Sequence, residues 1–312
     1  MRKILIFVFM LFISMLIVPM PTEKVAIFTN PIPEIKKPIL LSPDSPKTPT
    51  TTPQAKATSP IKKIPEKIII PPPPIVEPPK KALPDQTFYT QGLESVVNIL
   101  CSNARGNEYT IATGVIIDTK GYILSNAHVT DDLPKNPVCS IRRGSPARTF
   151  GTATLVFLPE AYKNASSEEQ RARHDISIWR LDTTASGLSA WPIDTSTAIA
   201  PNDQLRTLSY PAELLGGETI LTSLALVLSN TTVIETDQFI IQTSANLSAQ
   251  HGSSGGVLVN PYTARAQGLI FAVGEGNTAE RKYLYALTMR SVSETIANEK
   301  GKDIYMYLAS LP

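Results

Sequence analysis

Three residues that lie far apart in the sequence are of the types that carry out nucleophilic acyl transfer. His128 follows a strand-like apolar segment, Asp175 precedes another, and Ser254 lies in a glycine-rich turn. A histidine beside a serine removes the hydroxyl proton, and a carboxylate beside the histidine fixes the tautomer that does so. We therefore predict that these three side chains meet in one catalytic site, with Ser254 as the nucleophile.

The turn that holds Ser254 has the composition of an anion-binding loop. It reads Gly252-Ser-Ser-Gly-Gly, directly before the apolar run 257–259. Glycine adopts backbone angles that other residues avoid, so such a turn can point two amides at one place. Because inward-facing amides stabilise a developing oxyanion, we predict an oxyanion hole formed by the N–H groups of Gly252 and Ser254. Ser254 is preferred to Ser253 because two glycines follow it.

The remaining titratable residues near these motifs receive secondary roles. The chain has three histidines, and His174 and His251 are predicted to lie at the rim of the site. Asp182 is the alternative carboxylate if Asp175 faces away. We expect neither a metal nor another cofactor.

The elements around these residues indicate an all-β domain. Short β-branched runs recur between turn signals, without long intervening helices. The predicted strands are 96–100, 110–117, 122–125, 138–142, 176–181, 220–228, 239–243, 256–259, 268–273 and 283–289. The segment 118–121 reads as a hairpin turn. A helix is expected near the end, where Ser291 and Glu294 form a capping-box pattern, and residues 303–308 have helical apolar spacing.

Three motifs together resemble one known family. The segment 113–129, with His128, resembles the strand, hairpin and histidine of bacterial trypsin-like serine proteases, especially the HtrA/Deg group. Residues 175–178 resemble that family's aspartate strand, and 252–256 its nucleophile turn. The order His, Asp, Ser is that of chymotrypsin. The resemblance implies two six-stranded antiparallel Greek-key β-barrels with a C-terminal helix.

The same resemblance implies an activity and its residues. Ser254 would attack a peptide bond, His128 would act as general base and then acid, and Asp175 would orient the imidazole. The polypeptide substrates would be exported proteins. Ser253 stands where the family has Asp or Asn, which argues against activation by a newly formed N-terminus. No PDZ domain is expected after the protease domain. The competing hypothesis is a catalytically inactive trypsin-like binding module.

Specificity and the cysteines are also interpreted through the family. The residues implied to bind substrate are Ser248, Phe271, Ala272 and Val273. No acidic residue lies at the pocket floor, so we predict small or aliphatic side chains before the scissile bond. The alternative is that Tyr283 or Tyr285 fills the pocket. The family places the strands of Cys101 and Cys139 side by side, which permits a disulfide; two free buried thiols are the alternative.

Composition divides the chain into three parts. All 16 glycines lie at or after Gly92, whereas 16 of the 27 prolines lie between Pro31 and Pro84. The net charge is only +2, which gives no sign of a nucleic-acid partner. The predicted parts are a signal-anchor or transmembrane segment (1–22), a disordered Pro/Lys-rich linker (23–85) and a protease domain (86–312), with barrels at about 92–195 and 196–290 and a helix at about 291–310.

The N-terminal part predicts an extracytoplasmic location. Arg2 and Lys3 precede an apolar run over 4–18, which is typical of an export signal. Because no small-residue cleavage site follows, we expect a single-pass membrane anchor with the protease domain outside the cytoplasm. A cleaved signal and a secreted protein are the alternative. The basic linker favours extended polyproline II structure and could contact cell-wall polymers.

Overall fold

The computed structural model describes residues 81–312, except for 107, 184–186, 213–219 and 275–282. The predicted hydrophobic helix at 1–22 and the linker as far as residue 80 lie outside the described residues. None of the helices within the described ranges is long and apolar enough to cross a bilayer.

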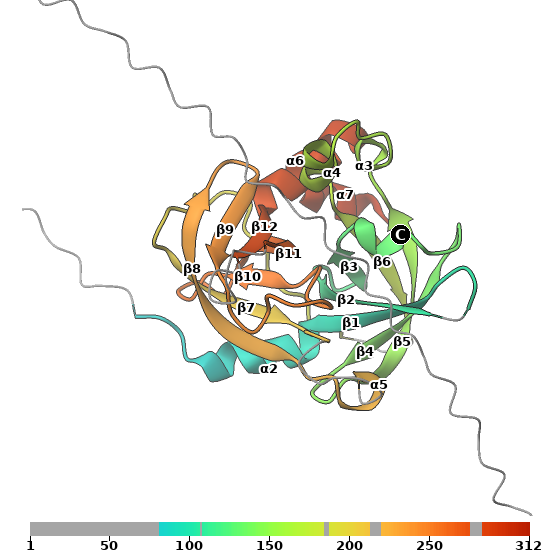
Figure 1. The fold of residues 1–312 in the computed structure, drawn as a ribbon, viewed down its shortest axis with the longest axis horizontal. Coiled ribbons are helices and arrows are strands. Elements are labelled where there is room, and N and C mark those ends of the chain that lie inside the picture. The colour runs from blue at the N-terminus through green and yellow to red at the C-terminus, as the bar shows by residue number, and fades with distance from the viewer. Residues whose placement is uncertain (1–80, 107, 184–186, 213–219, 275–282) are drawn as a thin grey trace, which may run out of the picture.

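Two closed barrels stand side by side and make up most of the described chain (Figure 1). The first consists of β1 (Val96–Ser102), β2 (Tyr109–Ile116), β3 (Tyr122–Ser125), β4 (Val138–Arg143), β5 (Arg148–Phe157) and β6 (Ser177–Asp182). Its strands are hydrogen-bonded in the order β1-β2-β3-β6-β5-β4, and every pair is antiparallel.

The second barrel has the same number of strands. It consists of β7 (Gln204–Ser209), β8 (Val227–Thr236), β9 (Ile240–Ser244), β10 (Val257–Val259), β11 (Ala266–Gly274) and β12 (Tyr283–Thr288). They pair antiparallel in the order β10-β11-β12-β9-β8-β7. The prediction of two six-stranded antiparallel barrels with a C-terminal helix is therefore confirmed.

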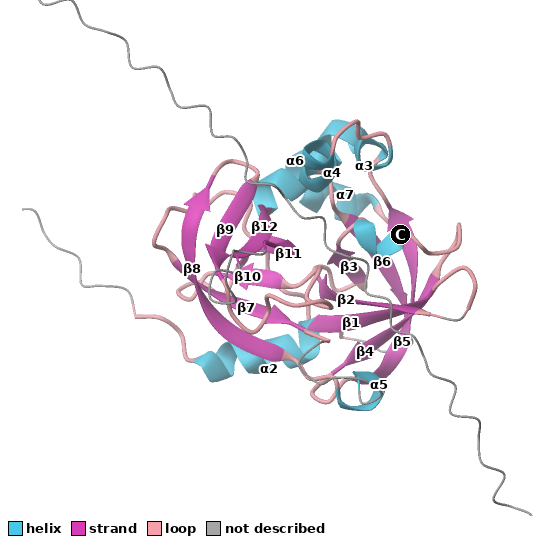
Figure 2. Ribbon diagram, viewed as in Figure 1, coloured by secondary structure: helices cyan, strands magenta, loops and turns pink. Residues whose placement is uncertain are grey.

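The helices lie outside the barrels (Figure 2). They are α2 (Asp85–Ser95), the 3-10 turn η1 (His128–Thr130), α3 (Glu160–Lys163), α4 (Glu168–Arg173), α5 (Ile220–Ser223), α6 (Met289–Lys300) and α7 (Ile304–Ser310). Both α3 and α4 belong to the connection between β5 and β6, and Figure 1 shows them beside α6 at one end of the molecule.

Side-chain alternation along the strands builds three cores. Val97, Ile99 and Cys101 of β1 point into the first barrel and join its interior cluster, as the two-residue period of a strand requires. A second cluster, which includes Ile241 and Leu258, fills the other barrel. The largest cluster contains buried residues from both barrels and from α6 and α7. The two barrels therefore share one apolar interface.

Several sequence predictions need correction. Strands β5 and β7 were not predicted. Most of β5 is exposed or half-buried, and β7 has only two apolar residues, Leu205 and Leu208, among four polar ones. Helices α2, α3 and α4 were also missed. The segment predicted as one strand over 220–228 instead contains α5, with β8 beginning only at Val227.

The C-terminal helix begins earlier than predicted. The side chain of Thr288 caps α6 by accepting a hydrogen bond from the Ser291 N–H at 3.0 Å. Ser291 is therefore a buried residue inside the helix and not its cap. Thr288 is also the last residue of β12, so the strand passes directly into the helix. The predicted helix at 303–308 corresponds to α7, which Asp303 caps.

A disulfide joins Cys101 on β1 to Cys139 on β4. The two strands are paired in register at Leu100 and Ser140, which brings the two cysteines opposite each other. Both are buried, with at most 1% of either residue exposed. The bond closes a loop with a sequence separation of 38, and this loop contains His128.

Removal of this disulfide should lower stability. We expect the double variant Cys101→Ala/Cys139→Ala to lose about 2 to 4 kcal/mol of unfolding free energy, because the unfolded chain regains the freedom of an open loop. Denaturant unfolding of the double variant and the wild type measures the loss. Cys101→Ala alone should lose a similar amount. Equal stability of all three proteins would contradict the prediction.

Candidate active site

Asp175 holds His128 at two points. Its Oδ2 atom lies 2.7 Å from Nδ1 of the histidine ring, and its Oδ1 accepts the backbone N–H of His128 at 2.8 Å. The side-chain amide of Asn126 donates to the carbonyl of Asp175 at 2.9 Å. Asp175 is only 3% exposed, so these contacts form in a medium that strengthens them. The arrangement leaves Nε2 of His128 as the ring atom available for proton transfer.

Local structure explains why the two residues meet. Strands β3 and β6 pair from Tyr122 opposite Arg180 to Ser125 opposite Ser177. His128 lies just after the end of β3 and Asp175 just before the start of β6, so an antiparallel pair brings them to the same edge. The sequence motifs already indicated both strands, and the predicted proximity of His128 and Asp175 is what the structure shows.

The electrostatic environment shifts the proton affinity of His128. Burial of the ring lowers its pKa, but the charge of Asp175 and the hydrogen bond to it raise the pKa. Asp131 also raises the pKa, and Arg171 lowers it. The net result is a pKa above the ordinary value of 6.5, as expected when a carboxylate stabilises the imidazolium.

The turn around Ser254 has the backbone of an anion-binding loop. Gly252 and Gly255 have φ angles of 89° and 85°, in the left-handed region that favours glycine. Within the described residues, the N–H groups of Gly252 and Ser254 donate to no protein acceptor, whereas those of Ser253, Gly255 and Gly256 do. The oxyanion hole formed by these two amides stays a prediction.

Thr113 of β2 ties this turn to the first barrel. Its N–H donates to the carbonyl of Ser254 at 2.8 Å, and its hydroxyl donates to the carbonyl of Gly252 at 2.7 Å. The same hydroxyl accepts the N–H of Tyr210 at 2.9 Å. A Cβ at Gly255 would overlap the Thr113 carbonyl oxygen, so this close approach requires glycine. Sequence reasoning included Thr113 in a motif but gave it no role.

The turn of Ser254 also contacts the strand that precedes His128. Gly255 lies against the hydroxyl of Ser125, a residue of the strand that leads to His128. Ser254 is 6% exposed. No hydrogen bond joins it to the His128 ring in the part of the chain that the structure describes, so the contact between nucleophile and base stays a prediction. In free enzymes this contact is commonly longer than in the substrate complex.

The side chain of Ser253 is on the buried side of the turn. It is buried, and its hydroxyl accepts a hydrogen bond from Ser209 at 3.0 Å. Two neutral hydroxyl groups, those of Ser253 and Ser209, therefore pair with each other. Because residue 253 carries no charge, it needs no positively charged partner.

The residues predicted to bind substrate lie close to this turn but are mostly covered. Phe271 and Ala272 are buried in β11, and Val273 is half-buried. Ser248 is fully buried, and its hydroxyl donates to Thr207 at 3.0 Å. Tyr285 packs against Gly274. Because residues 275–282 lie outside the described part, the predicted specificity of the pocket remains a prediction.

The alternative residues lie away from the His128 ring contacts. His174 Nδ1 lies 3.2 Å from the Thr295 hydroxyl on α6. Asp182 stands at the far end of β6, opposite Thr152 of β5. The structure therefore brings Asp175, and not Asp182, to His128.

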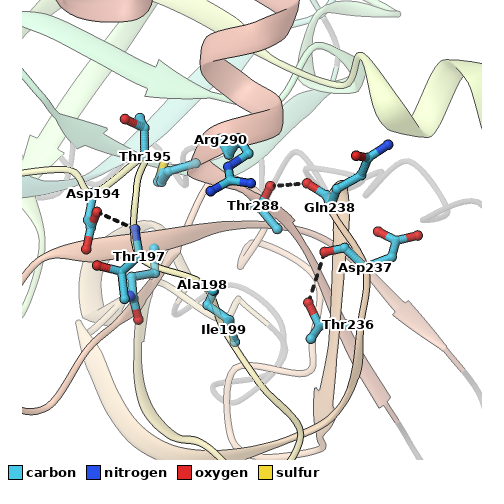
Figure 3. A pocket seen from close by; sticks show the side chains of 12 residues that line it. Asp194, Thr195, Thr197, Ala198, Ile199, Thr236, Asp237, Gln238, Thr288 and Arg290 are labelled. Atoms are coloured by element: carbon cyan, nitrogen blue, oxygen red, sulfur yellow. Dashed lines mark hydrogen bonds between the residues drawn. The ribbon is translucent and has the colours of Figure 1, made fainter.

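A separate pocket lies between the inter-barrel segment and the start of α6 (Figure 3). It encloses about 230 Å³ and is lined by residues that include Asp194, Asp237 and Arg290. Both carboxylates accept backbone N–H groups, from Thr197 and from Phe239. None of the predicted site residues lines this pocket, so it is not the predicted specificity pocket.

Comparison with known proteins identifies the family. Residues 112–299 match the family model of the trypsin-like peptidase domain. The chain belongs to this family. The matched segment contains all three predicted triad residues.

Individual relatives are more distant. The serine endoprotease DegS of Salmonella typhimurium is 27% identical over 154 residues, which are 48% of this chain and 36% of DegS. The chain thus matches well under half of that relative. The solved HtrA-type protease AlgW with a tripeptide has a TM-score of 0.50 and 18% identity, over 70% of this chain and 65% of AlgW.

A serine endoprotease from Yersinia pestis has a TM-score of 0.49 and 19% identity, over 72% of this chain and 70% of that chain. The likeness to AlgW supports the two-barrel fold. The family match confirms the predicted relation to trypsin-like serine proteases, and DegS is a relative from the HtrA/Deg group to which the chain is similar.

Loss of the Thr113 hydroxyl should loosen the contact between the barrels. We expect Thr113→Val to lower the free energy of unfolding by about 1 to 3 kcal/mol, because it leaves the Gly252 carbonyl and the Tyr210 N–H without their partner. Thr113→Ser, which keeps the hydroxyl, is the matched control and should stay near the wild type. Denaturant unfolding monitored by fluorescence measures both. A Val variant as stable as the Ser variant would refute this role of the hydroxyl.

Proposed function

We propose that this chain is a serine endopeptidase that hydrolyses peptide bonds through an acyl-enzyme. The observation that supports this most is the two-point contact of Asp175 with the ring and backbone of His128. The free amides of Gly252 and Ser254 add a second, independent feature of the same chemistry. A binding module would need neither the buried aspartate nor the two unpaired amides.

Each residue has a defined step in the proposed reaction. Neutral His128 takes the proton of the Ser254 hydroxyl through Nε2 while the serine oxygen attacks the substrate carbonyl carbon. Asp175 holds the Nδ1 proton and stabilises the imidazolium that forms. The amides of Gly252 and Ser254 donate to the oxyanion, which contributes about 3 to 4 kcal/mol per donor in such sites. His128 then returns the proton to the leaving amine, and water hydrolyses the acyl-enzyme by the same route.

The proposed function includes a substrate class and a location. The substrates are exported polypeptides, and the protease domain acts outside the cytoplasm on a membrane-anchored or secreted chain. The N-terminal export signal in the sequence supports this. The Cys101–Cys139 disulfide also supports it, because such bonds persist mainly in oxidising compartments.

Covalent labelling by a fluorophosphonate tests the activity. We expect the wild type to be labelled and Ser254→Ala to show no labelling, because the reagent bonds only to an activated serine. Ser253→Ala is the matched control and should keep most of the labelling. Unlabelled wild type with a normal circular dichroism spectrum would favour the inactive binding module instead.

A peptide-library cleavage profile tests the specificity. We expect cleavage after small or aliphatic residues, because Ser248 is neutral and its hydroxyl is held by Thr207. None of the four residues predicted to bind substrate carries a carboxylate that could pair with a basic side chain. A strong preference for Arg or Lys would overturn this assignment while leaving the proposed triad intact.

A further inference from the structure

Three residues form a polar cluster beside the His128 turn. Asp131, Tyr162 and Arg171, here called the Asp131 cluster, come from the end of η1, from α3 and from α4. The Tyr162 hydroxyl lies 3.1 Å from each carboxylate oxygen of Asp131. The Arg171 guanidinium lies 2.6 Å from Oδ2 of the same carboxylate and 4.6 Å from the centre of the Tyr162 ring. All three side chains thus contact one another.

The Asp131 cluster links the turn that carries His128 to the turn that leads to Asp175. On one side, the Asp131 N–H donates to the carbonyl of His128 at 3.2 Å. On the other side, the carbonyl of Arg171 accepts the N–H of His174 at 3.1 Å, immediately before Asp175. The turn after β3 and the turn before β6 are therefore joined by two side-chain pairs, Asp131–Arg171 and His128–Asp175.

The connection that carries Tyr162 and Arg171 is also fixed from its other face. The Ala161 N–H donates to the Glu299 carboxylate of α6 at 3.0 Å. The Arg173 guanidinium lies 4.6 Å above the ring of Phe239. The connection between β5 and β6 is thus held between the His128 turn and the second half of the chain, as Figure 1 shows for α3, α4 and α6.

The cluster also sets charges near His128. The charged groups that act on the ring come from three places: Asp175 before β6, Asp131 at the end of η1, and Arg171 on α4. Burial raises the pKa of the Asp131 carboxyl, and the Arg171 guanidinium lowers it. The side chains of Asp131 and Arg171 are 32% and 38% exposed, so solvent partly screens their effect.

We propose that the Asp131 cluster positions the catalytic base: it fixes the turn of His128 relative to Asp175, and it adds a second negative charge near the ring, which Arg171 balances. Asp131, Tyr162 and Arg171 are positioning residues and do not touch the substrate. The inference rests on the proposed function, because it concerns the base of the proposed triad. None of the three residues belongs to the motifs that indicate the family.

The pH dependence of fluorophosphonate labelling tests the charge effect. Labelling requires neutral His128, so its rate rises with pH through the pKa of that residue. Asp131→Asn removes a negative charge, which should lower the midpoint by on the order of half a pH unit. Arg171→Gln removes a positive charge and should move the midpoint upward. Lys163→Gln, on the neighbouring helix α3 and paired with Glu160, is the control and should leave it unchanged.

A purely structural role would give a different result. If Asp131→Asn and Arg171→Gln both label more slowly but keep the wild-type midpoint, the inference is wrong. A midpoint that Lys163→Gln moves as far as Arg171→Gln would overturn it as well.

A second measurement separates this inference from the proposed function. Titration of the His128 ring by NMR in full-length Ser254→Ala needs no activity, and the chain has only two other histidines to assign. If wild type is not labelled, the proposed function fails. The shift of the His128 pKa on adding Asp131→Asn still decides whether the Asp131 cluster acts on the ring; an unmoved pKa refutes it.

Discussion

The site depends on a backbone contact between two barrels. Ser254 belongs to the second barrel and His128 to the first, so their separation is set by how the barrels pack. Thr113 of the first barrel fixes that packing beside Ser254, because its N–H and hydroxyl donate to two backbone carbonyls of the turn 252–256. Gly255 permits the approach because it has no side chain to overlap Thr113. The shared apolar core holds the two barrels together. The hydrogen bonds of Thr113 fix the position of the Ser254 turn relative to the first barrel.

The parts of the site that the sequence predicted are those with local causes. His128 and Asp175 each adjoin a short apolar strand, and pairing of these strands is enough to bring the residues together. The backbone around Ser254 has left-handed angles at Gly252 and Gly255, which glycine adopts readily. The family resemblance then supplied the barrels, and the match over residues 112–299 agrees with it. The local sequence patterns alone indicate His128, Asp175 and Ser254, but they do not indicate the two-barrel fold that arranges these residues in space.

The missed parts have non-local causes. Strand β5 fully buries only Ala153 and Phe157, and Gly151 and four polar residues interrupt its apolar positions, so no regular pattern marks it. Its pairing with β4 and β6 gives it the strand conformation. Likewise, α3 and α4 are too short for a helical period. Glu299 of α6 binds the N–H of Ala161 in α3, and Arg173 of α4 stacks on Phe239. The Asp131 cluster joins residues up to 40 positions apart, which no local pattern indicates.

The position of α6 in the chain has a consequence for biosynthesis. This helix follows both barrels in sequence, yet Glu299 holds the connection that leads to Asp175, and Thr295 contacts His174. A ribosome therefore completes the first barrel long before it makes the helix that braces the aspartate loop of that barrel. A nascent chain that has exposed only its first barrel therefore lacks the contacts of α6 with Ala161 and His174.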